Sequence, residues 1–183
     1  DDSYDDAIRE LTAQGLAGEA IFFNLALDDL GQAADLFRPV FDGSGGVDGW
    51  ASLEVSPLFA GDCANTIKAA RHLHARAARP NLLIKIPETP EGIPAIEQSI
   101  ADGIPINITL LFSRAHYLAA AAATMRGIER RLAAGKDPAV ASVASIFVSR
   151  WDAAVTDRVP AALRNRLGIA VAMRIYKAHL DLL

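Results

Sequence analysis

The sequence predicts an α/β fold built on a parallel sheet. Short extended runs alternate with longer helical stretches, a pattern typical of parallel strands joined by right-handed crossovers. The expected strands occupy residues 50–55, 82–86, 104–111 and 143–148. Each run carries apolar residues on one face and polar residues on the other, whereas a sheet buried on both faces is almost continuously apolar.

The residues before the first strand are expected to form two helices. Ser3 is placed to cap a first helix that ends near Gly15, and residues 18–41 carry apolar side chains at helical spacing. Residues 42–46 contain three glycines in five positions, so we expect a loop there.

The helices that follow the strands are indicated by their ends and their periodicity. Aspartate, threonine and serine open several of them as N-caps, while Gly103 and Gly135 close two. The expected ranges are 62–79, 90–102, 113–134, 151–159 and 162–183.

The two faces of each expected strand differ in polarity. The polar face carries Ser52 and Glu54, then Lys85, then Asn107 and Thr109, and finally Ser145 with Phe147. The opposite face carries aliphatic residues such as Ile84, Ile108 and Leu110. In a (β/α)8 barrel the outward residues pack under helices and the inward ones line the barrel, with chemistry at the carboxyl ends of the strands. A doubly wound open sheet would instead bury both faces and bind ligands at loop tips. We therefore favour a (β/α)8 barrel, represented by a partial barrel of four parallel strands with surrounding helices.

Composition bounds the classes of function. At 183 residues and 19.5 kDa, a single domain over residues 1–183 is expected, and 51% hydrophobic residues exclude disorder. The net charge is −4 with no basic stripe, so no nucleic-acid partner is expected. No apolar run reaches the roughly 18 residues of a membrane span. Cys63 is the only cysteine, which fits a reducing cytoplasm and argues against a cysteine-based zinc site.

No motif indicates a cofactor or a metal. Phosphate-binding glycine motifs of nucleotide sites are missing from the sequence. The four histidines fall on expected helices, where surface positions are the simpler interpretation.

Lys85 differs from the other three lysines. Lys68 and Lys177 lie on expected helices and Lys136 in an expected turn, whereas Lys85 lies inside an apolar strand. A buried ammonium must find a carboxylate or lose its proton. Two interpretations follow: an ion pair with Glu54, or a Schiff-base lysine whose neutral amine attacks a carbonyl.

The neighbouring polar residues fit either interpretation. In a Schiff-base site, Glu54 and Thr109 would hold the water that moves protons, while Asn107 and Ser145 would bind substrate hydroxyls. In a structural site, Glu54 forms a salt bridge and the other three are a satisfied polar lining.

Four collinear blocks resemble the signature blocks of the transaldolase family. They are WASLEVSP at 50–57, NLLIKIP at 81–87, GIPINITLLFS at 103–113 and SVASIFVSR at 142–150. The resemblance runs from about Ser3 to the last residue. It implies that Lys85, on the fourth strand of the barrel, forms an imine with a ketose phosphate, and that Glu54 and Thr109 hold the catalytic water.

The resemblance also implies the substrates. Asn107 and Ser145 bind the dihydroxyacetone moiety, Phe147 lines the site, and Arg150 reaches the substrate phosphate. The family transfers a three-carbon unit between sugar phosphates such as sedoheptulose 7-phosphate and fructose 6-phosphate, in the pentose phosphate pathway of the cytoplasm. It uses no metal and no organic cofactor; whether this protein forms a homodimer is left open.

Two other functions are considered. A fructose 6-phosphate-type aldolase shares the lysine but is shorter between strands five and six, so the long helix at 113–135 weighs against it. A non-catalytic half-barrel is the alternative from another class. We expect strands one, two, seven and eight of the barrel to lie outside this sequence. Glu88 stands where the family usually has glycine, so it is expected either to disturb the loop beyond Lys85 or to point to solvent.

Overall fold

The structure, a computed structural model, describes residues 2–183 and contains one sheet of four parallel strands. The strands are β1 (Ala51–Glu54), β2 (Leu82–Pro87), β3 (Ile106–Leu111) and β4 (Ser142–Ile146). They are hydrogen-bonded in chain order, β1-β2-β3-β4, and all three pairings are parallel. This confirms the predicted α/β class. An order without reversal is also that of a barrel, because a doubly wound sheet reverses at its switch point.

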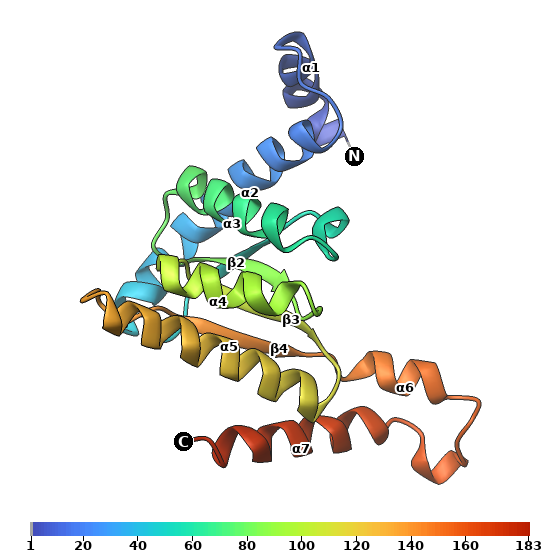
Figure 1. Cartoon of the computed structure of the whole chain (residues 1–183). Coiled ribbons are helices and arrows are strands. Elements are labelled where there is room, and N and C mark those ends of the chain that lie inside the picture. The colour runs from blue at the N-terminus through green and yellow to red at the C-terminus, as the bar shows by residue number, and fades with distance from the viewer. Residues whose placement is uncertain (1) are drawn as a thin grey trace.

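The crossovers between the strands are helical, as predicted. They contain α3 (Cys63–Ala77), α4 (Gly92–Asp102) and α5 (Arg114–Ala133). Figure 1 shows α4 and α5 lying side by side along one face of the sheet. The remaining helices are α1 (Asp5–Ala13) and α2 (Glu19–Gly43) before the sheet, and α6 (Ser149–Val155) and α7 (Leu167–Leu180) after it.

Several predicted helix ends are confirmed by their cap geometry. Asp62 accepts a hydrogen bond from the backbone N–H of Asn65 at 3.0 Å, and Ser113 accepts one from His116 at 3.1 Å. Gly103 ends α4 at a φ of 90°, a conformation that glycine adopts without steric cost.

Other predicted ends were wrong. The first α-helix begins later than predicted: Ser3 lies in a 3-10 turn, Asp2–Tyr4, and the N-cap position of α1 is Tyr4. The predicted helix at 162–183 is divided into a 3-10 turn, Ala161–Leu163, and α7. Strand β4 ends at Ile146 rather than at Val148, whose backbone is already helical at the start of α6.

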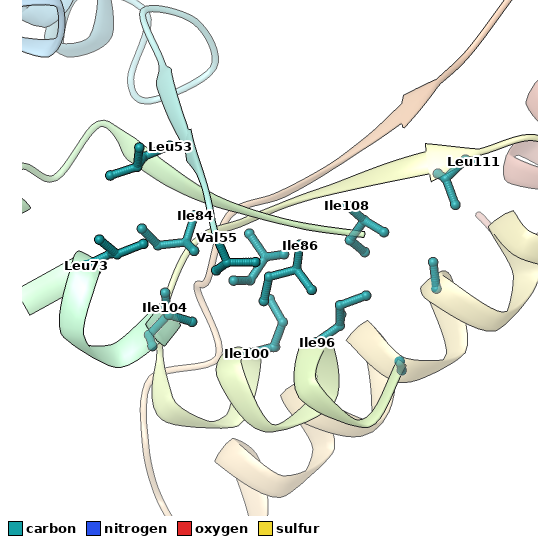
Figure 2. Packing of buried hydrophobic residues seen from close by; sticks show 14 of the residues in the cluster. Leu53, Val55, Leu73, Ile84, Ile86, Ile96, Ile100, Ile104, Ile108 and Leu111 are labelled. Carbon is teal, nitrogen blue, oxygen red and sulfur yellow. The ribbon is translucent and has the colours of Figure 1, made fainter. Parts of the chain in front are cut away.

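The core lies between the sheet and its helices. Ile86 and Ile108 project from β2 and β3 onto Ile96 and Ile100 of α4, and Ile84 lies beside Leu73 of α3, as Figure 2 shows. Each such side chain stabilises the fold by about 1.5–3 kcal/mol when fully buried. The aliphatic faces predicted for the strands are therefore the faces that the helices cover.

Strand β3 departs from strict alternation. The register between β3 and β4 shifts between Ile108 and Leu111, and Leu110 has a φ of 62°. The prediction that Leu110 continues the aliphatic face was wrong, because Leu111 enters the core in its place. A bulge of this kind re-aims the side chains that follow it.

Within residues 2–183, none of the helices combines the length and the apolar character that crossing a membrane requires.

Candidate functional site

Three predicted site residues form one row across the sheet. The strand register pairs Glu54 with Lys85 and Lys85 with Asn107, so the three α-carbons are direct neighbours on β1, β2 and β3. Their side chains lie on the face opposite the core, because their chain neighbours, such as Ile84 and Ile106, are buried beneath the helices.

Lys85 and Glu54 form an ion pair. Nζ of Lys85 donates to Oε2 of Glu54 at 2.9 Å, and the two side chains are 26% and 46% exposed. A pair this open to water adds at most about 1 kcal/mol to stability. The contact agrees with the interpretation of Lys85 as the partner of Glu54 in an ion pair. It also places a carboxylate where a Schiff-base lysine needs a proton acceptor.

Asn107 is held at both ends of its amide. Oγ of Ser145 donates to Oδ1 of Asn107 at 2.7 Å, and Nδ2 of Asn107 donates to Oγ of Ser52 at 3.1 Å. Ser52 lies on β1, and β2 separates it from β3. Alternate strands of a flat sheet are roughly 9.6 Å apart, so this contact requires the polar face to be concave.

Thr109 is buried beside the row rather than exposed within it. Its α-carbon pairs with that of Pro87, and none of its surface is accessible. Among residues 2–183, its hydroxyl oxygen has no hydrogen-bond partner. The structure thus brings Thr109 to the same end of the sheet as Lys85, without a direct hydrogen bond to Lys85 or to Glu54.

Phe147 and Arg150 meet at the carboxyl end of β4. The backbone N–H of Phe147 donates to the carbonyl of Leu111 at 3.1 Å, and its ring stacks on Phe112 at 5.3 Å. Cζ of Arg150 lies 4.4 Å from the centre of the Phe147 ring, a cation–π contact. The guanidinium group is exposed and makes no hydrogen bond to the part of the chain that the structure describes, so its donors are available to an anion.

The prediction that Glu88 points to solvent was wrong. Its side chain is only 10% exposed, and Oε2 lies 3.1 Å from Nδ1 of His116. Burial raises the pKa of the Glu88 carboxyl, and the charge of His116 opposes that rise. The carboxylate therefore neither points to solvent nor leaves the loop without contacts; it joins the end of β2 to the first turn of α5.

Ser52 was not among the residues predicted for the site. The alternation of Ala51, Ser52, Leu53 and Glu54 already placed it on the polar face. What the sequence could not indicate was the curvature that brings its hydroxyl to Asn107, two strands away.

The fold and this row of side chains define an α/β protein with consecutive parallel β/α units and a lysine-centred polar site on the concave face of its sheet. Residues 1–181 match the model of the family described as transaldolase/fructose-6-phosphate aldolase. The chain belongs to this family.

Three relatives illustrate the match, and each is named transaldolase. The protein of Neisseria gonorrhoeae is 43% identical over 175 residues, which cover 95% of this chain and 50% of the relative. That of Thermobifida fusca is 41% identical over 186 residues, covering 97% and 50%. That of a Parafrankia species is 43% identical over 187 residues, again covering 97% and 50%. The chain thus spans about half the length of the curated relatives it matches.

Proposed function

We propose that this chain carries the Schiff-base site of a transaldolase. In this proposal Lys85 bonds covalently to a three-carbon dihydroxyacetone unit and passes it from a ketose phosphate to an aldose phosphate. The observation that carries the proposal is the 2.9 Å contact between Nζ of Lys85 and Oε2 of Glu54, with Asn107 beside them in the same row. The relatives that bear the name transaldolase add support.

Imine formation begins when the Lys85 ammonium gives a proton to the Glu54 carboxylate across their contact. The neutral amine then attacks the C2 carbonyl of the ketose and forms a carbinolamine. Glu54 returns the proton to the departing hydroxyl, which leaves as water, so that a protonated imine and the Glu54 carboxylate remain. The buried hydroxyl of Thr109, which lacks a partner among residues 2–183, would be satisfied by a water shared with Glu54.

The remaining residues would bind the substrate. Asn107 and Ser145 would meet the hydroxyls of the three-carbon unit. Arg150, held over the Phe147 ring, would bind the phosphate through paired hydrogen bonds from its planar guanidinium. Ser145, Phe147 and Arg150 lie at or just beyond the carboxyl end of β4, where (β/α)8 barrels place their active sites, and Asn107 lies beside Lys85.

Borohydride trapping tests the proposal. The full-length polypeptide is incubated with fructose 6-phosphate, reduced with borohydride and analysed by peptide mass spectrometry. We expect a reduced three-carbon adduct on Lys85, none in Lys85→Ala, and an unchanged adduct in Lys68→Ala, whose lysine lies on α3. An adduct confined to Lys68, Lys136 or Lys177 would refute the assignment.

The acceptor distinguishes transfer from simple cleavage. With erythrose 4-phosphate present, a transaldolase forms sedoheptulose 7-phosphate, whereas a fructose 6-phosphate aldolase releases free dihydroxyacetone. We favour transfer because α5 is long, at 20 residues. We also propose sugar phosphates as the small-molecule partners and the cytoplasm as the location, which the single cysteine, Cys63, supports. Cell fractionation tests the location.

A further inference from the structure

Residues of two other strands, β1 and β4, hold the side-chain amide of Asn107. Ser145 on β4 donates to Oδ1, and Ser52 on β1 accepts from Nδ2. The contact with Asn107 is the sole side-chain hydrogen bond of Ser52 among residues 2–183. The three groups form a directional chain of hydrogen bonds across the concave face, next to the Lys85 position.

The number of donors and acceptors on Asn107 determines which of them remain free for a ligand. An asparagine amide has two N–H donors and an oxygen with two lone pairs. Ser52 and Ser145 engage one donor and one lone pair, so one donor and one lone pair stay free, pointing from a half-buried side chain. The hydroxyl of Ser145 already donates its hydrogen bond to Asn107, so it can only accept a hydrogen bond from a ligand.

We propose that Ser52 is a positioning residue, which sets the plane of the Asn107 amide so that its free donor and free lone pair meet the hydroxyls of the three-carbon unit on Lys85. This inference rests on the proposed function. The torsion that turns an asparagine amide is soft. With Ser145 alone the amide is held at a single point and can rotate about it; the contact to Ser52 supplies the second point.

A substrate-independent measurement tests the positioning itself. The two side-chain N–H protons of Asn107 should give separate, well-dispersed NMR signals in the full-length polypeptide. Ser52→Ala should move these signals toward the shifts of a freely exposed asparagine amide, whereas Ser52→Thr keeps a hydroxyl and should preserve them. Signals that are the same in Ser52→Ala as in the unmodified protein would overturn the inference, whatever the protein catalyses.

Kinetics test the consequence. Loss of one neutral hydrogen bond should lower kcat/KM of Ser52→Ala by about 2- to 10-fold, and Ser52→Thr should recover most of it. In an Asn107→Ala background the Ser52→Ala change should have no further effect, because Ser52 acts through the amide. An equal loss in both backgrounds would mean that Ser52 acts elsewhere and would sink the inference. Failure of the proposed function is a separate result: no borohydride adduct on Lys85 in the unmodified protein.

Discussion

Oε2 of Glu88 lies 3.1 Å from Nδ1 of His116, and this contact ties the residue after β2 to the first turn of α5. The backbone on either side is also anchored: the N–H of Glu88 donates to the carbonyl of Thr109 at 2.9 Å, and Oγ1 of Thr89 donates to the carbonyl of Ala60 at 2.6 Å. A carboxylate three residues beyond Lys85 is thus part of a rigid junction at the carboxyl end of the sheet.

Stability should depend on pH through Glu88. Burial raises the pKa of its carboxyl in the folded state, so the unfolded chain loses this proton at lower pH than the folded protein. Protonated Glu88 contributes fully to the free energy of unfolding when the pH is below the pKa of this carboxyl in the unfolded chain, about 4.3. That contribution is lost as the pH rises through the pKa of Glu88 in the folded protein. Thermal unfolding of Glu88→Gln should therefore show a Tm advantage over the unmodified protein that grows with pH above about 4.3.

His116→Gln is the matched control for that experiment. Removing the imidazole removes the charge that opposes the rise in the Glu88 pKa, so the loss of stability with pH should become steeper. If the Tm difference between Glu88→Gln and the unmodified protein stays constant from pH 4 to pH 7, burial of Glu88 is not what sets the dependence.

Glu54→Gln should reduce the rate and leave binding largely intact. The amide keeps the size and the contact with Lys85 at 2.9 Å but cannot take up the proton. We expect kcat to fall by about 10²–10⁴, with a smaller change in KM. Steady-state kinetics with fructose 6-phosphate decide the matter: a large rise in KM at unchanged kcat would assign Glu54 to binding.

Arg150→Ala should discriminate between phosphorylated and free substrates. The exposed guanidinium over Phe147 makes no ion pair with any residue among 2–183, so its loss would remove no structural ion pair, and in the proposed role it would remove a phosphate ligand. We expect kcat/KM to fall by at least about 10-fold for fructose 6-phosphate, in the range of a charge-assisted hydrogen bond. Activity with free fructose as donor and an unphosphorylated aldehyde as acceptor should hardly change, because neither carries a phosphate. Similar losses with both donors would indicate a structural role; Arg114→Ala, on the first turn of α5, serves as the control.

Gly127→Ala should destabilise the packing of α5 on α4. A Cβ at this position would lie 2.7 Å from Cβ of Ile100 and 2.8 Å from the carbonyl oxygen of Glu97. Overpacking of this kind costs about 1–3 kcal/mol. Gly61→Ala is the control, because a Cβ there has no described atom within 4 Å and should change the free energy of unfolding little. Denaturant titration of both variants measures the difference.

The sequence predicted those features that depend on neighbours in the chain. Lys85 and Ile84 face opposite ways because consecutive strand residues do so, and this local rule placed Glu54, Lys85 and Asn107 on one face. The caps at Asp62 and Ser113 were predicted for the same reason, since each side chain bonds a backbone group three residues away.

Features that depend on distant segments were not predicted. The bulge at Leu110 is set by the register with β4, more than thirty residues further along the chain. The contact of Glu88 with His116 depends on where α5 lies beside the end of β2, and the contact of Ser52 with Asn107 depends on the curvature of the sheet. The roles of Lys85, Glu54, Thr109, Asn107, Ser145, Phe147 and Arg150 stay predictions.

The strand order has a consequence for the way the protein is made. Among residues 2–183 each strand pairs with the next one in the chain, so the contact order of this four-stranded sheet is low. During synthesis, β1 and β2 can pair before β4 has left the ribosome, and the ion pair of Glu54 with Lys85 can form with them. Ser145 is made after Ser52 and Asn107, so Asn107 gains its second side-chain partner only when β4 joins the sheet. We expect nascent chains stalled beyond residue 113 to resist proteolysis over β1 to β3; their rapid digestion would show that the sheet assembles only as a whole.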